Sequence, residues 1–338
     1  MKRHRISRRN FIGKSAATVG MATIGSTVMA GSSVARSVNS KIFPREVWIA
    51  SVSQTNTIEN ILSILDGAKI YKPDIVCLPE LFHLSNIGKK STYKEKVELS
   101  DEALSKISVF SKENNCYTIC PVYTHEKGKI YNAAVIFNRL GTKIGEYRKI
   151  HLSEAEISDG VIPGPLTPPV FKTDFGIIGI QICFDILWDE SWKKLREQGA
   201  EIVFWPSAFA GGQMVNTKAW QNKYAVVSST RKNTSKICDI TGEVISQTGH
   251  WNKNLICAPV NLEKVFLHTW PYVRRFPEIQ AKYGRKIKIT HFHEEEWAII
   301  ESLSPDVSVN DIITEFELRT HEQHTRYAET LQMEARMK

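Results

Sequence analysis

The chain has 338 residues, of which 42% are hydrophobic and 24% are charged. This composition is typical of a folded globular protein and excludes a disordered one, and the length allows one large α/β domain or two smaller domains. Most of the net charge of +8 comes from the first 35 residues, which hold six Lys and Arg and no acid, whereas the rest carries 38 basic and 36 acidic residues. A nearly neutral body lacks the basic footprint of a nucleic-acid-binding protein, so no nucleic-acid partner is expected.

Residues 1–35 predict an export signal. A basic opening is followed by an uncharged stretch over residues 15–35, with small residues that suit signal-peptidase cleavage after Ala30 or Ala35. Residues 7–14, SRRNFIGK, resemble the twin-arginine signal. An uncleaved membrane anchor is the alternative, but its Ser, Thr and Gly make insertion weak, so no stable membrane insertion is expected. We therefore expect a protein exported to the periplasm or the medium.

The next part of the chain alternates short apolar runs with amphipathic ones. Strands are predicted at residues 46–53, 74–78, 116–123, 131–138, 143–149, 176–183, 201–205, 225–229, 235–240, 243–247 and 255–261. Helices are predicted at residues 58–71, 103–112 and 190–197 and around Trp220. Continuous apolar strands between helices indicate a sheet covered by helices, and the hairpins indicate a mixed sheet.

The pattern changes from about His268. The following residues are irregular and charged, and residues 314–336 are mostly polar and predicted to be helical. We interpret residues 266–338 as a C-terminal extension that packs on the preceding domain or at an oligomer interface. The chain is then divided into a signal at 1–35, a main domain at 36–265 and this extension.

Three residues of types that can act in catalysis lie at or just after the ends of predicted strands. Glu80 follows a buried strand and a proline, and Lys149 and Cys183 each end a strand. Active sites of α/β proteins gather at the carboxyl ends of strands. Each residue alone has an ordinary explanation, as an acid at a helix N-terminus, a solvated strand end or a buried core cysteine.

Their surroundings resemble the three motifs of the nitrilase, or carbon–nitrogen hydrolase, superfamily. Residues 74–82 (DIVCLPELF) resemble its glutamate motif, residues 145–152 (GEYRKIHL) its lysine motif and residues 179–185 (GIQICFD) its cysteine motif. YNAA at 131–134, GVIPGP at 160–165 and WPSA at 205–208 agree with it. The resemblance covers residues 47–262. It implies a four-layer α-β-β-α sandwich of two mixed sheets and a homodimer or larger homo-oligomer.

The resemblance also implies roles for these residues in hydrolysis. Cys183 is the expected nucleophile, Lys149 the oxyanion stabiliser and Glu80 the general base. A thiol is mostly protonated at neutral pH, and a neighbouring lysine favours the thiolate while a carboxylate can remove the proton. No cofactor is required, and no CxxC or His-rich cluster predicts a metal site.

The family carries a second glutamate after the lysine motif, and residues 153–160 offer two candidates. Glu156 is preferred to Glu154 because its position before Gly160 fits better. We expect it to orient the substrate or to tune Lys149. His151, close by, is interpreted as a structural histidine rather than a catalytic partner.

The substrate is inferred from the residues after the nucleophile. Nitrile-cleaving members usually carry Trp-Glu there, whereas this chain has Phe184-Asp185, which resembles the amide-cleaving branches. A linear amide or carbamoyl amide is therefore the expected substrate, with nitrile hydrolysis as the alternative and an inactive binding scaffold as the alternative of another class. The expected substrate-binding residues follow strand ends near the nucleophile: Phe184, Trp188, Ser207, Ala208 and Phe209.

Overall fold

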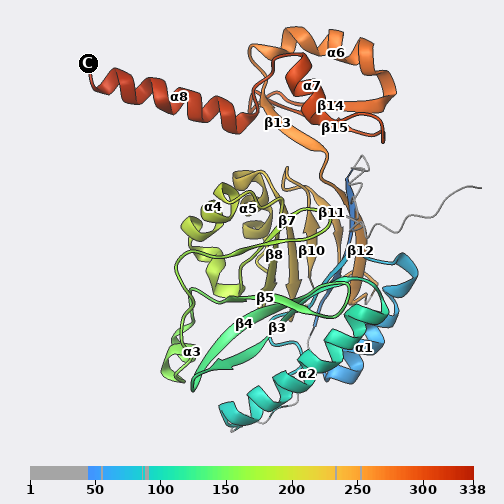
Figure 1. Ribbon diagram of the computed structural model, residues 1–338, viewed down its shortest axis with the longest axis vertical. Coiled ribbons are helices and arrows are strands. Elements are labelled where there is room, and N and C mark those ends of the chain that lie inside the picture. Colours follow the sequence, from blue (N-terminus) through green and yellow to red (C-terminus); the bar gives the residue numbers. More distant parts are fainter. Residues whose placement is uncertain (1–44, 55, 86, 88–90, 233, 252) are drawn as a thin grey trace, which may run out of the picture. The chain divides into compact units, whose positions relative to one another are not determined.

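The computed structural model describes residues 45–338 except 55, 86, 88–90, 233 and 252 (Figure 1). The predicted export signal at residues 1–35 lies outside the described residues. Within the described part, no helix combines the length and the apolar character needed to cross a bilayer.

Six strands form the first sheet. In spatial order they are β12 (Leu255–Asn261), β1 (Glu46–Val52), β2 (Ile75–Cys77), β3 (Tyr117–Glu126), β4 (Lys129–Phe137) and β5 (Lys143–Arg148). Neighbours β1, β2 and β3 are parallel, and the outer pairs are antiparallel. The β3–β4 hairpin turns at Gly128, whose φ of 76° is easiest for glycine.

The second sheet repeats this arrangement. Its order is β11 (Val244–Gln247), β10 (Lys236–Cys238), β9 (Ala225–Thr230), β8 (Ile202–Ser207), β7 (Ile177–Ile180) and β6 (Val170–Lys172). The central strands β7, β8 and β9 are parallel and the outer pairs are antiparallel. The strand predicted at 201–205 stops before Pro206, but β8 continues through Pro206 to Ser207, because the fixed φ of proline suits extended backbone near a strand end.

Three apolar layers hold the sheets and helices together. The largest lies between the two sheets and includes Ile49 of β1 and Ile180 of β7, both fully buried. The other face of the first sheet packs on α1 (Ile58–Asp66) and α2 (Tyr93–Glu113), and the other face of the second on α4 (Asp189–Glu197) and α5 (Gln213–Asn222). The expected α-β-β-α sandwich of two mixed sheets is thereby confirmed (Figure 1).

Several boundaries differ from the predicted ones. The helix predicted at 58–71 ends at Asp66, and the 3-10 helix η2 (Lys69–Tyr71) follows. Helix α2 begins ten residues before the predicted start at Ala103, because Thr92 and Glu95 form a capping box. The pattern also missed strand β6 and the short helix α3 (Glu154–Ser158).

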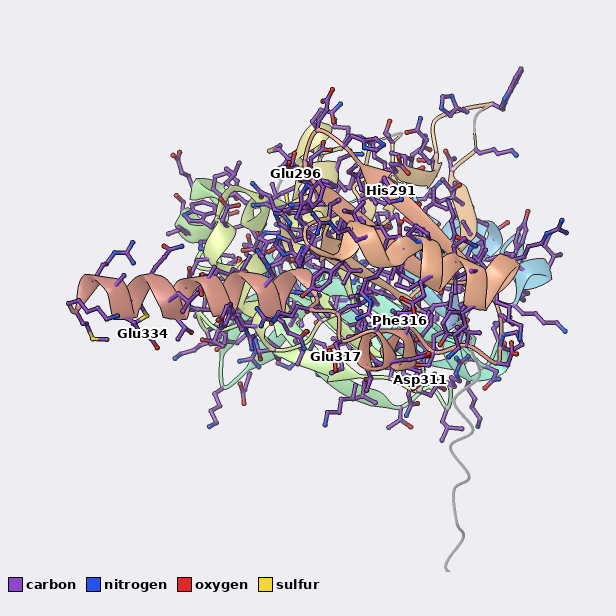
Figure 2. The ribbon with its side chains drawn as sticks, turned by 90° about the horizontal axis from the view of Figure 1, so that it is seen from above. His291, Glu296, Asp311, Phe316, Glu317 and Glu334 are labelled. Carbon is purple, nitrogen blue, oxygen red and sulfur yellow. The ribbon has the colours of Figure 1, made fainter. Side chains whose placement is uncertain are left out.

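The C-terminal part contains more regular structure than the sequence indicated. Strands β13 (Lys264–His268), β15 (Trp297–Ser302) and β14 (Ile287–Phe292) form an antiparallel sheet. It is followed along the chain by α7 (Val309–Glu315) and α8 (His321–Arg336), and η4 (Tyr272–Arg275), α6 (Phe276–Tyr283) and η5 (Gly284–Lys286) lie between β13 and β14. A separate apolar cluster, which includes Phe316 beside α7, supports this region (Figure 2).

Candidate active site

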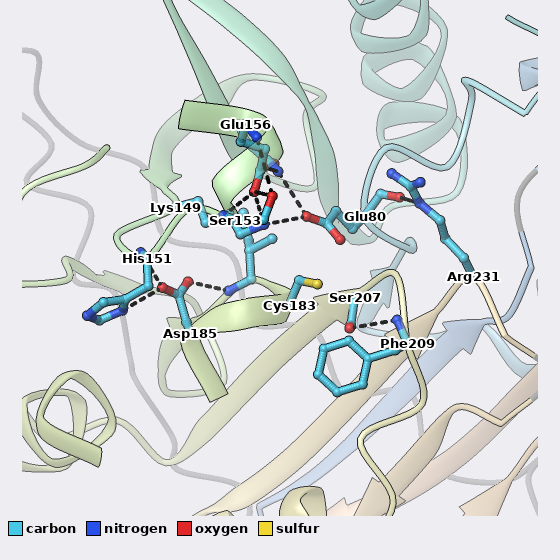
Figure 3. Close-up of polar contacts among 12 residues, drawn as sticks. Glu80, Lys149, His151, Ser153, Glu156, Cys183, Asp185, Ser207, Phe209 and Arg231 are labelled. Carbon is cyan, nitrogen blue, oxygen red and sulfur yellow. Dashed lines mark hydrogen bonds and ion pairs between the residues drawn. The ribbon is translucent and has the colours of Figure 1, made fainter. Parts of the chain in front are cut away.

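The predicted catalytic residues come together at strand ends. Glu80 follows β2, Lys149 follows β5, Cys183 follows β7, and Glu156 lies in α3. The Lys149 Nζ atom donates to Glu80 Oε1 at 2.9 Å and to Glu156 Oε2 at 2.8 Å (Figure 3). Lys149 and Glu80 are buried, with 2% and 3% of their surface exposed. One ammonium thus bridges two carboxylates in a site largely closed to water.

Asn132 completes this hydrogen-bonded cluster. Its Nδ2 donates to Glu80 Oε1 at 2.9 Å and to Glu156 Oε1 at 2.7 Å. Sequence analysis assigned no role to Asn132, although it belongs to the YNAA segment on β4, directly beside β5. Because a side-chain amide stays uncharged, Asn132 can fix both carboxylates without changing the charge of the site.

A helix cap positions the second glutamate. Ser153 accepts a hydrogen bond from the Glu156 N–H, and the Ser153 N–H donates to Glu156 Oε2 at 2.8 Å. This capping box holds the carboxylate at the N-terminus of α3, where it can also reach Lys149. The alternative candidate, Glu154, is exposed. The Ser-x-x-Glu spacing was available in the sequence as a signal for this geometry.

Cys183 lies on a sharp turn. Its φ is +49°, an uncommon value for a residue with a side chain, and it opens the 3-10 helix η3 (Cys183–Leu187). The Trp205 indole N–H donates to the Cys183 carbonyl at 2.9 Å and holds this conformation. Leu81, next to Glu80, also has a φ of +49°, and Arg231 Nε donates to the Glu80 carbonyl at 2.6 Å. Strained backbone of this kind clusters at functional sites.

Asp185 connects the cysteine turn with the lysine segment. Its buried carboxylate accepts hydrogen bonds from the Tyr147 hydroxyl at 2.6 Å, the Ile182 N–H at 2.8 Å and the His151 N–H at 2.8 Å. The His151 ring also contacts Asp185 and stacks on Trp188 at 4.1 Å. Asp185 therefore fixes the segments that carry both Lys149 and Cys183, a role that sequence analysis did not assign.

Burial and neighbouring charges set the protonation of the site. Burial opposes the charge of Lys149, but Glu80, Cys183 and Glu156 outweigh it and raise the pKa of Lys149. Burial likewise opposes the charge of Glu156, but Lys149 and the hydrogen bonds from Asn132 and Ser153 outweigh it and lower the pKa of Glu156. The lysine and this carboxylate are therefore both charged at neutral pH.

The thiol behaves differently from the sequence-based expectation. Burial and the Glu80 charge raise the pKa of Cys183 to about 12, and they outweigh Lys149, the Ala208 N–H and Ser207, which act in the opposite direction. Lys149 does favour the thiolate, as expected, but it does not determine the result. The resting thiol is neutral, so it needs a base during its reaction.

The five predicted substrate-binding residues lie on two segments around the cysteine. Phe184 and Trp188 belong to the turn after Cys183 and contact each other edge to face at 5.1 Å. Ser207 ends the neighbouring strand β8, and Ala208 and Phe209 follow it, with the Phe209 N–H donating to Ser207 Oγ at 3.0 Å. Trp188 is 40% exposed, whereas Ser207 is buried. Their contact with a substrate stays a prediction. Among the described residues, no three His, Cys, Asp or Glu side chains are grouped to hold a metal.

Comparison with known proteins identifies the family. Residues 39–266 match the family model described as carbon-nitrogen hydrolase. The chain belongs to the carbon–nitrogen hydrolase family. This confirms the family that the three motifs indicated, and the hydrolase match covers both large sheets.

Relatives of this carbon–nitrogen hydrolase include deaminated glutathione amidases. The enzyme of Bos taurus is 32% identical over 159 residues, which is 43% of this chain and 48% of the relative. That of Synechocystis sp. is 30% identical over 175 residues, 46% of this chain and 63% of the relative. The chain thus matches less than two thirds of the length of these relatives. An amidase structure from Nesterenkonia sp. superimposes with a TM-score of 0.58 at 17% identity, covering 70% of this chain and 96% of that chain, which shows a shared fold.

Proposed function

We propose that this protein hydrolyses the C–N bond of a linear amide or carbamoyl amide to an acid and ammonia, through a thioester on Cys183. The main support is the Lys149 ammonium, which bridges the Glu80 and Glu156 carboxylates and favours the thiolate form of Cys183. The amidase names of the relatives agree with amide chemistry.

The first step is attack of the Cys183 sulfur on the amide carbonyl carbon. Because the thiol is neutral, Glu80 takes its proton as the C–S bond forms. Among the described residues, the hydrogen bonds to the Glu80 side chain reach Oε1, from Lys149 and Asn132. Oε2 is therefore the oxygen available for the proton.

Attack moves the carbonyl electrons onto oxygen, and the resulting oxyanion needs donors. Lys149 supplies a fixed ammonium that is already paired and does not need to move. The Phe184 N–H can supply a second donor, since the first N–H groups of a helical turn have no partner within the turn. Removing one donor of such a pair typically costs about 3 kcal/mol of transition-state stabilisation.

Collapse of this intermediate completes the cycle. The C–N bond breaks, and Glu80 returns its proton to the departing ammonia. Water then attacks the thioester carbonyl while Glu80 takes a proton from it. When the C–S bond breaks, the acid leaves and the proton returns to Cys183. Glu156 and Asn132 keep Lys149 and Glu80 in place throughout.

The test is ammonia release by the protein from residue 36 onward. We would supply simple amides, carbamoyl compounds and nitriles to the wild type, to Cys183→Ala and to the matched control Cys257→Ala, which changes a half-buried thiol on β12. We expect release from amides or carbamoyl compounds that Cys183→Ala abolishes and Cys257→Ala retains.

Other results would point elsewhere. Preference for nitriles would replace the amidase proposal with a nitrilase. Release that survives in Cys183→Ala would rule out the thioester mechanism. No release from any compound, together with no alkylation of Cys183 by iodoacetamide up to high pH, would favour the binding-scaffold alternative.

A further inference from the structure

A second group of charged residues lies where α4 and α5 meet β13 and the start of α8. Two cavities of about 150 Å³ and 450 Å³ open there. Both are lined by Arg196, Lys223, His321 and Glu322, and by none of the proposed catalytic residues. Even the smaller volume is several times the roughly 30 Å³ occupied by one water molecule in the liquid.

Lys223 is the central cation of this place. It follows α5 in a left-handed conformation with a φ of 59°. Its ammonium lies 3.8 Å from the ring centre of Trp297 and 4.5 Å from that of Trp220, and it donates to the Trp220 carbonyl. In the described part of the chain no carboxylate forms an ion pair with Lys223, and the positive charge of Arg196 disfavours its protonated form. Burial and this neighbour lower the pKa of Lys223 to about 7.

Basic groups from several elements act on Lys223 and His321, and acids also line the larger cavity. His321 lies against Trp297 at 4.1 Å, and His268 stacks on His324 at 4.7 Å. Burial lowers the pKa of His321 to about 4, and Lys223, His324, His268 and Arg196 add to this effect. His321 is therefore uncharged at neutral pH, and Arg196 and Lys223 are the basic side chains that line both cavities with it.

Most acids that line the larger cavity form ion pairs: Asp189 pairs with Lys218, and Glu197 pairs with Lys193 at 3.9 Å. Glu329 of α8 also lines this cavity. Glu322 pairs with Arg196 at 3.3 Å and also with Arg326. In the smaller cavity, Arg45 pairs with Glu201 at 2.7 Å, and Lys264 pairs with Asp239 at 3.0 Å. These pairs leave the positive charge of Lys223 without a counter-charge, which is unfavourable for a half-buried cation.

We propose that the space around Lys223, His321 and Arg196, which line both cavities, is a binding site for a small oxyanion. Lys223 and His321 would hold the oxyanion beside Arg196. A carboxylate, phosphate or sulfate group offers several acceptor oxygens, and its charge would compensate that of the lysine. Bound there, it would contact the helices behind the hydrolase sheet and the first turn of α8 together. This site is independent of the proposed amide hydrolysis.

Calorimetric titration with sodium sulfate tests the proposal directly. Sulfate keeps its charge between about pH 6 and pH 8.5, so any change in affinity reports the protein. Sodium chloride at equal ionic strength corrects for general salt effects. We expect saturable binding of one sulfate, with an affinity that falls roughly tenfold or more over this range. The sign follows because binding requires protonated Lys223, which loses its proton as pH rises through about 7.

Three variants separate this site from the rest of the surface. Lys223→Met should abolish binding. Lys223→Arg should retain it and lose most of the pH dependence, because a guanidinium stays charged. Lys112→Met, which removes an exposed lysine at the end of α2, should bind as the wild type does. Titrations with acetate and inorganic phosphate at about pH 6 then rank the oxyanion classes.

The proposal would be overturned by two results. One is sulfate binding that is equal in Lys223→Met and the wild type. The other is heat that does not saturate in the wild type or in Lys223→Arg. Ammonia release is not the readout, so failure of this proposal leaves the amidase proposal intact.

Discussion

At the scale of single residues, the protonation of Cys183 is the feature that most constrains the mechanism. Glu80 raises the pKa of the thiol while Lys149 lowers it, and burial adds to the effect of Glu80. A neutral nucleophile beside a carboxylate favours proton transfer during attack over a preformed thiolate. The balance of these charges is testable without any substrate.

Alkylation by iodoacetamide should reveal this balance, because the thiolate is the reacting form. We expect the rate of Cys183 modification in the wild type to rise with pH well above neutrality. Glu80→Gln should shift the profile to lower pH, since a negative neighbour is removed. Lys149→Met should shift it to higher pH, since a positive neighbour is removed.

The comparison needs a second thiol as a control. Cys257→Ala should leave the Cys183 profile unchanged, and mass spectrometry would assign each modification. Equal profiles in the Glu80 and Lys149 variants would contradict the charge assignment.

Glu156 offers a second test at this scale. Its carboxylate receives hydrogen bonds from Lys149 and Asn132, whereas Glu154 on the same short helix is exposed. Glu156→Gln should therefore lower kcat at least about tenfold, because Lys149 loses one of its two carboxylate partners. Glu154→Gln should keep kcat within about twofold. The reverse pattern in ammonia release would show that the second glutamate was assigned wrongly.

At the scale of elements, the site depends on how loops join the ends of neighbouring strands. Strand β5 and strand β7 lie in different sheets, and Asp185 connects the segments that follow them. Within α3, the capping box fixes the position of Glu156 in a similar way. The positions of the proposed catalytic side chains are therefore set by these short segments, which the two packed sheets support.

Replacement of Asp185 measures that connection. In Asp185→Asn an amide N–H₂ replaces one of the two carboxylate oxygens, so it faces the backbone N–H of either Ile182 or His151 and that hydrogen bond is lost. We expect the free energy of unfolding to fall by about 2 kcal/mol, measured in urea. We also expect kcat to fall roughly 10- to 100-fold with a smaller change in KM, because displaced catalytic groups lose alignment.

A control of similar chemistry is available on the surface. Asp174 pairs with Arg139 and is 52% exposed, so Asp174→Asn should change the free energy of unfolding by at most about 1 kcal/mol. Unaltered kcat in Asp185→Asn would refute the positioning role.

At the scale of the whole molecule, the oligomeric state is a prediction that can be measured on the purified protein. The family resemblance leads us to expect a homodimer or a larger homo-oligomer. Sedimentation equilibrium of the protein from residue 36 onward should give at least twice the mass of one chain at micromolar concentration. A monomer at that concentration would contradict this expectation.

Export remains our proposal from residues 1–35. It is tested by exchanging Arg8 and Arg9 for Lys and by measuring how the protein is distributed between the cytoplasm and the exported fraction.

Much of the fold and site followed from local sequence patterns. Continuous apolar runs between amphipathic ones gave most strands of both sheets, because burial on two faces requires such runs. Glu80, Lys149 and Cys183 could be selected because each ends a strand within a motif. The strands of the C-terminal sheet were not found, since runs such as residues 287–292 mix apolar and polar side chains and lack the continuous apolar character of the predicted buried strands.

Tertiary structure decided what no local pattern contains. Asn132 and Asp185 acquire their roles from segments distant in sequence, and the raised thiol pKa depends on how deeply Cys183 is buried near Glu80. The unpaired charge of Lys223 appears only when α5, β13 and α8 meet. The sequence by itself determined which residue types were present and which strands they follow. Distances, burial and the sum of charges were decided by the packing of the whole chain, because each depends on residues far apart along it.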